Sequence, residues 1–279
     1  MYWKTTKGVV LLNTWNNIMS KWEYVLPPSR PSSIELDRIK SCLKYYNKDE
    51  PVGVLGSTIE YRDLLYELGF SKIFVFEKNI RYYASLNEWK VYPIDKENIV
   101  CGDWINTISE YKGFFNVLLS DLTMGNISYE KRESFFCSIY ESLKENGLFI
   151  DKVLTNEIGL ITLNDIEEKY SSTIINLRTV NDFSCEALFC SELLNRGIVD
   201  TSCFYDTLRR RFRNNYRLMR FIDKAHLITP EGCIWYYGKE WSNLKDFYFS
   251  FYQESILYED EVTSPYYGRL KHILNYKKE

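Results

Sequence analysis

The sequence predicts an α/β protein built on a doubly wound, mostly parallel sheet. Two observations predict this fold class. From residue 51 to residue 155, short apolar runs alternate with stretches of helical periodicity, which is the pattern of parallel strands joined by crossover helices. Most of the apolar runs are continuous, as expected for strands that are buried on both faces of a sheet.

The predicted strands and helices follow one another in regular order. The strands are expected at Pro51–Gly56, Lys72–Phe76, Asn98–Cys101, Phe114–Leu119 and Leu148–Leu154. The intervening helices are expected at Tyr61–Leu68, Asn79–Trp89 and Tyr129–Lys144, with Gly69 and Asn146-Gly147 as terminators. Right-handed crossovers place all the strand carboxyl ends at one edge of the sheet, where ligands bind in such folds.

The chain divides into three predicted regions. Residues 1–50 contain an aromatic helical portion, a proline-rich break and an amphipathic stretch from Ser32 to Tyr45, and they are interpreted as a helical cap or lid beside the cleft. Residues 51–155 form the ligand-binding core. Residues 156–279 are expected to supply the rest of the sheet and an acceptor-binding elaboration, with helices near Leu163–Tyr170, Asp182–Leu194 and Cys203–Arg213. Two aromatic sections, Cys233–Tyr237 and Phe247–Tyr258, provide either the remaining strands or that elaboration.

The composition narrows the class of function. A formal net charge of −3 on 279 residues argues against binding to nucleic acid through bulk electrostatics. The seven cysteines include no CxxC pair, and no histidine stands at zinc-finger spacing, so reduced thiols and no metal site are expected. No apolar run approaches the length of a membrane span, and the apolar run at the amino terminus is too short for a signal peptide. We therefore expect a cytoplasmic protein that does not use a membrane.

The chemistry-bearing residues stand where the predicted strands end. Gly56-Ser57-Thr58 follows the first strand, Glu77-Lys78 the second, Gly102-Asp103-Trp104 the third and Asp121 the fourth. An adenosyl ligand needs a small-residue turn that its tail can approach, then an acid for the ribose hydroxyls, then an acid for the adenine amino group. Carboxylates in this order predict a nucleotide-like ligand at the sheet edge.

In this order and spacing, the segment from Pro51 to Leu154 resembles the core of the class I S-adenosylmethionine (SAM) dependent methyltransferases. Val52–Thr58, Phe76-Glu77, Gly102–Trp104 and Leu119–Leu122 stand at the places of four family motifs, and Leu143–Phe149 resembles the turn before the fifth strand. The resemblance implies a Rossmann-like sheet of seven strands with SAM as the cofactor. The first motif departs from the family, because Ser57 and Thr58 stand where further glycines are usual; the missing GxGxxG pattern also argues against NAD.

The resemblance also implies roles for individual residues. Gly56, Ser57 and Thr58 would approach the amino-acid tail of SAM, and Arg30 or Arg62 would pair with its carboxylate. Glu77, beside Lys78, would bind the ribose, and Asp103, beside Gly102, the adenine, on which Trp104 would stack. Asp121 would lie beside the transferred methyl group and is the candidate catalytic residue.

The acceptor is left open by the sequence. A small molecule or a peptide is the leading expectation, and an RNA or protein substrate is an alternative. Asp121 and Lys152 are similar to the Asp and Lys of RNA ribose 2′-O-methyltransferases, although the further lysine of those enzymes has no match near Ser29-Arg30. A non-catalytic protein that binds SAM or another nucleotide is a third possibility. The basic cluster from Arg209 to Arg220 is either a solvated helix face or a site for an acidic acceptor.

Overall fold

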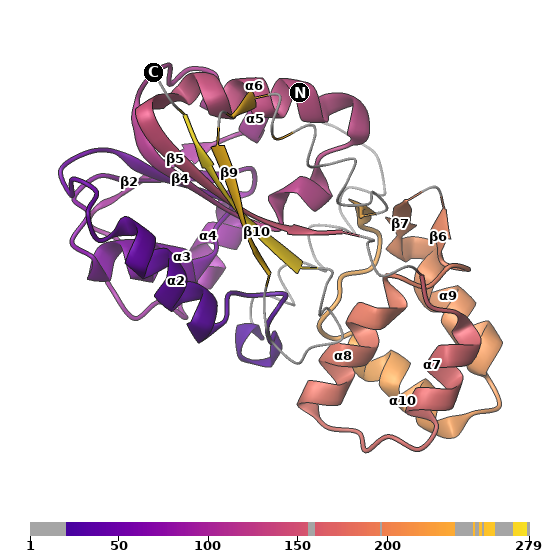
Figure 1. The fold of residues 1–279 in the computed structure, drawn as a ribbon. Helices are drawn as coiled ribbons and strands as arrows, with labels where there is room; N and C mark the ends of the chain where they lie inside the picture. Colours follow the sequence, from indigo (N-terminus) through magenta and orange to yellow (C-terminus); the bar gives the residue numbers. More distant parts are fainter. Residues whose placement is uncertain are drawn as a thin grey trace, which may run out of the picture.

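The computed structural model describes residues 21–155, 160–195, 197–237, 248, 251–252, 254–259 and 270–277. Its centre is a sheet with the strand order β3-β2-β1-β4-β5-β10-β9 (Figure 1). The strands, in chain order, are β1 (Val52–Leu55), β2 (Ile73–Glu77), β3 (Glu97–Cys101), β4 (Phe115–Asp121), β5 (Leu143–Leu154), β9 (Glu254–Glu259) and β10 (Leu270–Tyr276). The first five pair in parallel, whereas β10 runs antiparallel to both β5 and β9.

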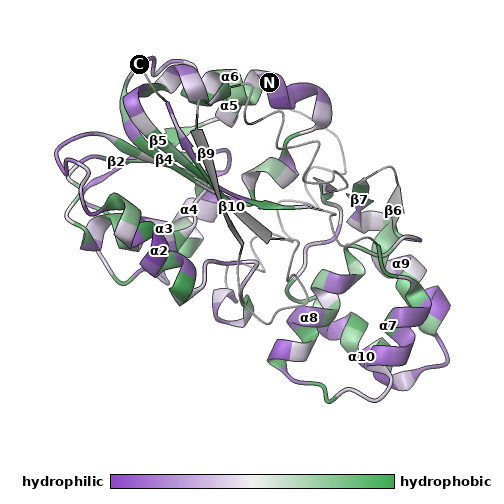
Figure 2. Ribbon diagram, in the orientation of Figure 1, coloured by the Kyte–Doolittle hydropathy of each residue, from purple (hydrophilic) through white to green (hydrophobic). Residues whose placement is uncertain are grey.

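Helices cover both faces of this sheet. They are α2 (Ser33–Leu43), α3 (Ile59–Glu67) and α4 (Ile80–Asn87) on one face, and α5 (Trp104–Ile108) and α6 (Arg132–Ser142) on the other. Successive strand residues point to opposite faces, so Val117 and Leu119 of β4 pack on the first face while Leu118 packs on the second. The apolar colouring of the strands in Figure 2 reflects this burial on both faces.

A second lobe follows β5 in the chain. It consists of the helices α7 (Leu163–Tyr170), α8 (Leu177–Ala187), α9 (Thr201–Phe212) and α10 (Tyr216–Ala225), and of a small antiparallel sheet made of β6 (Leu194–Asn195), β7 (Ile198–Asp200) and β8 (Ile234–Tyr236). The lobe has its own apolar core, which includes Phe183, Leu208 and Phe221. In Figure 1 it lies to one side of the central sheet.

Residues 21–31 connect these two parts of the molecule. They contain the short 3₁₀ helix η1 (Trp22–Tyr24). On the sheet side, the Trp22 indole donates a hydrogen bond to Glu60 of α3 over 3.0 Å. On the lobe side, Asn181 of α8 accepts from the Leu26 amide over 3.2 Å and donates to the Tyr24 carbonyl over 3.1 Å. We call residues 21–31 the strap.

The predicted mixed α/β architecture with a mostly parallel central sheet is confirmed. The helix predicted to reach Lys144 ends at Ser142, because β5 already begins at Leu143. The helix predicted from Asp182 begins earlier, at Leu177, where the Asn176 side chain caps it through the Thr179 amide. Cys233–Tyr237 contributes β8 to the small sheet, and Glu254–Glu259 joins the central one. Within the described ranges, no helix has the length and apolarity needed to cross a membrane.

Candidate cofactor and acceptor site

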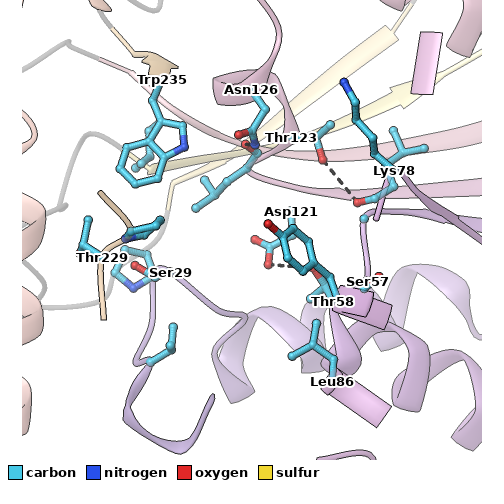
Figure 3. A pocket seen from close by; sticks show the side chains of 18 of the residues that line it. Ser29, Ser57, Thr58, Lys78, Leu86, Asp121, Thr123, Asn126, Thr229 and Trp235 are labelled. Atoms are coloured by element: carbon cyan, nitrogen blue, oxygen red, sulfur yellow. Dashed lines mark hydrogen bonds between the residues drawn. The ribbon is translucent and has the colours of Figure 1, made fainter. Parts of the chain in front are cut away.

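A cavity of about 430 Å³ lies at the carboxyl ends of β1, β2 and β4. One wall comes from residues that follow the strands, and the opposite wall from the strap and the second lobe. Figure 3 shows Ser57, Thr58 and Asp121 on the first side and Thr229 and Trp235 across from them. This is the sheet edge at which the sequence predicts a ligand.

The turn after β1 brings backbone to the cavity. Gly56 has a φ of +87°, which is a conformation that residues with a Cβ rarely adopt. The turn leads into α3, and Thr58 lies at the N-cap position of that helix. Gly56, Ser57 and Thr58 all line the cavity, so a ligand can approach the backbone closely here.

Glu77 ends β2 with its carboxylate held in place from two directions. Its Oε2 accepts from the Ser57 hydroxyl over 2.8 Å and its Oε1 from the Asn79 amide over 2.9 Å. The residue is only 7% exposed, and desolvation raises the pKa of its carboxyl group above the ordinary value. Each carboxylate oxygen keeps acceptor capacity beyond one hydrogen bond, as binding of a ribose diol requires.

Asp103 and Trp104 begin α5 at the end of β3. The Oδ1 of Asp103 caps that helix through the Ile105 amide over 3.2 Å, and its Oδ2 lies 3.5 Å from the Lys78 ammonium. The Trp104 indole donates to the Phe76 carbonyl over 2.9 Å, which fixes the ring against the cavity. Asp103 therefore has a structural role as a helix cap and still presents an oxygen to the cavity.

Asp121 lies at the end of β4 in a buried cluster of charges. Its Oδ1 is 2.9 Å from the Lys152 ammonium, whose other side is 3.3 Å from Glu35 of α2. Its Oδ2 accepts from the Thr58 hydroxyl over 3.3 Å (Figure 3). Burial raises the pKa of Asp121 to about 6, and Lys152 limits that increase. At neutral pH the carboxylate is ionised and faces the cavity with a charge that is only partly compensated.

The residues after Asp121 have a strained backbone. Leu122 lines the cavity and has a φ of +56°, a left-handed conformation that is uncommon for a residue other than glycine. Strain of this kind gathers at functional sites, where the surrounding structure holds it in place.

Gly125, in the following 3₁₀ helix η2 (Thr123–Asn126), lets Tyr237 pack closely, because a Cβ there would lie 2.4 Å from the tyrosine ring.

The opposite wall is mostly apolar. It is formed by Trp22, Val25, Pro28 and Ser29 of the strap, by Ser184, Cys185 and Leu188 in or beside α8, and by Ile228, Thr229, Pro230, Trp235 and Tyr237. The hydroxyl groups of Ser184 and Thr229 hydrogen-bond to each other. This wall carries no ionisable group that is charged at neutral pH among the described residues, since burial raises the pKa of the Cys185 thiol and of the Tyr237 hydroxyl.

Eight of the eleven predicted site residues line one cavity: Gly56, Ser57, Thr58, Glu77, Lys78, Asp103, Trp104 and Asp121. Arg30, Arg62 and Gly102 are not part of its wall. Arg30 pairs with Glu60 over 2.9 Å. The Arg62 guanidinium is completely buried, pairs with Glu97 over 2.6 Å and donates to the Ser57 carbonyl over 3.4 Å.

Sequence reasoning missed most of the opposite wall. Trp235 and Tyr237 could have been recognised as candidate wall residues from the sequence, because aromatic residues two positions apart on a strand point to the same face. Tyr82 and Leu86 of α4 also line the cavity and follow Glu77 closely in the chain. By contrast, Cys185 and Thr229 carry no local pattern that marks them as site residues.

Comparisons with known proteins show the fold. No family model matches the sequence, and no curated protein matches it. A structure from Rhodobacter sphaeroides, provisionally named a Zn-dependent alcohol dehydrogenase, has a TM-score of 0.57 at 14% identity and covers 98% of this chain and 100% of that one. Phosphoethanolamine N-methyltransferase 2 of Haemonchus contortus, solved with phosphomonomethylethanolamine and S-adenosylhomocysteine, has a TM-score of 0.50 at 12% identity, covering 99% of this chain and 61% of that one. This chain has a Rossmann-like α/β fold.

These likenesses establish the fold alone, since the two similar structures carry different names and one fold hosts many reactions. The argument for a function must therefore come from the site. Among the described residues, no group of three or more His, Cys, Asp and Glu side chains is arranged to hold a metal ion.

Proposed function

We propose that the protein is a SAM-dependent methyltransferase that acts on a small molecule or a peptide. The observation that carries this proposal is the convergence of Gly56–Thr58, Glu77, Asp103-Trp104 and Asp121 on one cavity at the ends of successive parallel strands. These acids follow successive strands at the edge where doubly wound folds bind ligands.

The residues present fit SAM. The carboxylate of Glu77 binds the ribose hydroxyls, and Asp103 accepts from the adenine amino group while Trp104 packs on the ring. The glycine turn at Gly56, with its φ of +87°, gives the amino-acid tail access to the backbone. Bound SAM supplies a methyl group on a cationic sulfur, which keeps the bonding electron pair when the methyl group moves to the nucleophile. The protein must then align the nucleophile and receive its proton.

Asp121 is the best-placed group to receive that proton. It lies in the cavity wall, and its pKa of about 6 makes it a stronger base than an ordinary aspartate while leaving it ionised at neutral pH. The Lys152 ammonium lies 2.9 Å from the Asp121 carboxylate and orients it, and Lys152 is itself completely buried. An RNA-type mechanism needs a lysine that reaches the substrate, and Lys152 is engaged by two acids instead.

The test is a direct search for the cofactor. Mass spectrometry of the purified protein should detect co-purified S-adenosylhomocysteine (SAH), and calorimetry should give a 1:1 binding isotherm with SAM and with SAH. ATP and NAD serve as matched ligands that share the adenosine but carry phosphates, and they should bind far more weakly. Failure of both SAM and SAH to bind would sink the proposal. Binding of SAM without turnover on any acceptor would favour the non-catalytic alternative.

We also propose that residues 1–50 act as a lid over the cofactor and the acceptor. Trp22, Val25, Pro28 and Ser29 line the cavity, and the strap contacts both the sheet side and α8. A lid of this kind excludes water from the transferred methyl group. Deletion of residues 1–30 should abolish turnover while the sheet stays folded and cofactor binding remains measurable. A truncated protein that methylates at the full rate would show that the segment is only structural.

A further inference from the structure

The charges around the cavity are unbalanced. Among the described residues that line it, Glu77, Asp103 and Asp121 carry carboxylates, and Lys78 alone carries a cation. Lys78 lies next to Asp103, on the cofactor side, with a side chain that is 73% exposed. An anionic acceptor would therefore meet carboxylates and no buried cation, which is the arrangement that disfavours an anion most.

The next layer of charges does not change this balance. Lys152, which lies behind Asp121, forms an ion pair with Glu35. Arg30, near the end of the strap, forms an ion pair with Glu60. Each of these pairs is neutral as a whole. The excess of negative charge thus belongs to the cavity itself, and a cofactor with a cationic sulfur and a zwitterionic tail offsets only part of it.

The acceptor side adds two hydrogen-bonding groups on two neighbouring aromatic rings. Trp235 lies on β8 and Tyr237 directly follows that strand. Their ring centroids are 5.9 Å apart with the ring planes tilted by 36°, and each residue is 7% exposed. No hydrogen bond to the Trp235 indole nitrogen or to the Tyr237 hydroxyl comes from the described residues. Neither atom is completely enclosed, and both residues line the cavity, so each group can pair with a polar atom of a bound ligand. Asp121 is close enough to Tyr237 for its charge to add to the burial that raises the pKa of that hydroxyl.

Building on the proposed function, we propose that the acceptor is an amine on a flat, apolar body that has no carboxylate or phosphate. Its ring packs against Trp235 and Tyr237, which bind an uncharged polar substituent such as a hydroxyl or ether oxygen. Its nitrogen faces Asp121, whose carboxylate holds the amine and receives a proton from it. The Arg209–Arg220 cluster does not line the cavity and plays no part in this recognition.

Three probes with one ring test the charge preference. Tyramine, 2-(4-hydroxyphenyl)ethanol and 3-(4-hydroxyphenyl)propanoate differ in one terminal group, which is an ammonium, a hydroxyl or a carboxylate. Each is titrated by calorimetry into the SAH-saturated protein at pH 7.5. Tyramine should bind about tenfold or more tighter than the propanoate, with the alcohol between them, because a partly buried carboxylate contributes on this scale to binding a cation.

Matched variants assign the preference to residues. Asp121→Asn should remove the advantage of tyramine over the alcohol, because the asparagine amide can still accept from a hydroxyl but carries no charge. Asp103→Asn removes the same charge from the cofactor side of the cavity and should leave the tyramine-to-alcohol ratio unchanged. Tyr237→Phe keeps the ring and removes the hydroxyl, and Trp235→Phe keeps an aromatic but smaller ring and removes the indole donor. Each should weaken all the probes that bind by a similar factor of about three to ten.

The outcomes separate this inference from the proposed function. If SAH does not bind, the proposed function fails. If SAH binds and the propanoate binds as tightly as tyramine, the charge argument is wrong. If SAH binds and none of the three probes binds, the flat amine is wrong as an acceptor class while the cofactor site stands.

Discussion

The two walls of the cavity are built in different ways. The cofactor wall comes from residues that directly follow β1, β2, β3 and β4, so the topology of the sheet places them together. The acceptor wall comes from the strap, from α8 and from β8, and more than a hundred residues of chain separate the strap from the other two. The first wall is polar and acidic, and the second is apolar and uncharged.

This difference shows which wall of the cavity is fixed by the Rossmann-like sheet and which wall can vary in sequence. Under the proposed function, the strand ends supply groups for an adenosyl ligand in a fixed order, whatever the acceptor is. The second lobe has its own core and its own small sheet, so its wall can change without disturbing the central sheet. The strap is the place where the two walls meet, whereas the Asp121–Lys152–Glu35 cluster supports the cofactor wall alone.

The largest expected effect comes from breaking that cluster. Lys152→Met leaves Asp121 and Glu35 buried without their shared cation, which should lower the free energy of unfolding by about 3–5 kcal/mol. Urea denaturation measures the change. The matched control is Lys144→Met on the same strand, because Lys144 is 35% exposed and pairs with the similarly exposed Glu50, so its loss should cost less than about 1 kcal/mol. Equal stability losses for the two variants would show that the cluster is not a buried unit.

A smaller effect should be confined to the cofactor wall. In Glu77→Gln, the Gln side chain can still accept from the Asn79 amide and donate to Ser57, so the fold should be retained. SAH affinity should fall by about 2 kcal/mol, or roughly thirtyfold, the scale of hydrogen bonds to a charged group. Calorimetry measures this, and Trp235→Phe on the other wall should leave SAH affinity within about twofold. Unchanged SAH affinity in Glu77→Gln would contradict the ribose assignment.

The same division explains what the sequence could predict. Continuous apolar runs identified five parallel strands, and strand order then placed Glu77, Asp103 and Asp121 at one edge. Arg62 was assigned to the cofactor because it is a cation near the glycine turn, but Glu97 on β3 binds it instead. Pairing between a helix and a later strand leaves no local signal. For the same reason, the sequence pattern around Trp235 could not show that this residue lines a cavity formed by residues far earlier in the chain.

A pH dependence should sharpen the role of Asp121. Its pKa of about 6 is raised by desolvation, and the carboxylates of Glu35 and Glu60 add to this while Lys152 opposes it. Tyramine affinity for the SAH-saturated protein should therefore fall about tenfold per pH unit below pH 6, as the carboxylate takes up a proton. Asp121→Asn should show no such step.

The direction of the pKa shift of Asp121 distinguishes this loss of tyramine affinity from unfolding at low pH. Because the folded-state pKa lies above the ordinary value of 3.8, the folded protein binds more protons than the unfolded chain between these two values. The contribution of Asp121 to stability is then most favourable at low pH and is lost as the pH rises through about 6. The melting temperature is followed in parallel with the affinity. Because the contribution of Asp121 does not destabilise the fold at low pH, loss of tyramine binding on acidification is assigned to the site. A tyramine affinity that does not change between pH 7 and pH 5 would contradict the contact.

The smallest effect concerns the strap, which touches both walls. Trp22→Phe keeps the apolar packing against Ile59 and Leu86 but removes the indole donor to Glu60. Arg30 still pairs with the same carboxylate oxygen over 2.9 Å, so the free energy of unfolding should fall by only about 1 kcal/mol. If the strap acts as a lid, tyramine binding to the SAH-saturated protein should weaken severalfold while SAH affinity stays within about twofold, because Trp22 anchors the residues that close the acceptor wall. Equal weakening of SAH and tyramine would instead assign the strap to the cofactor wall.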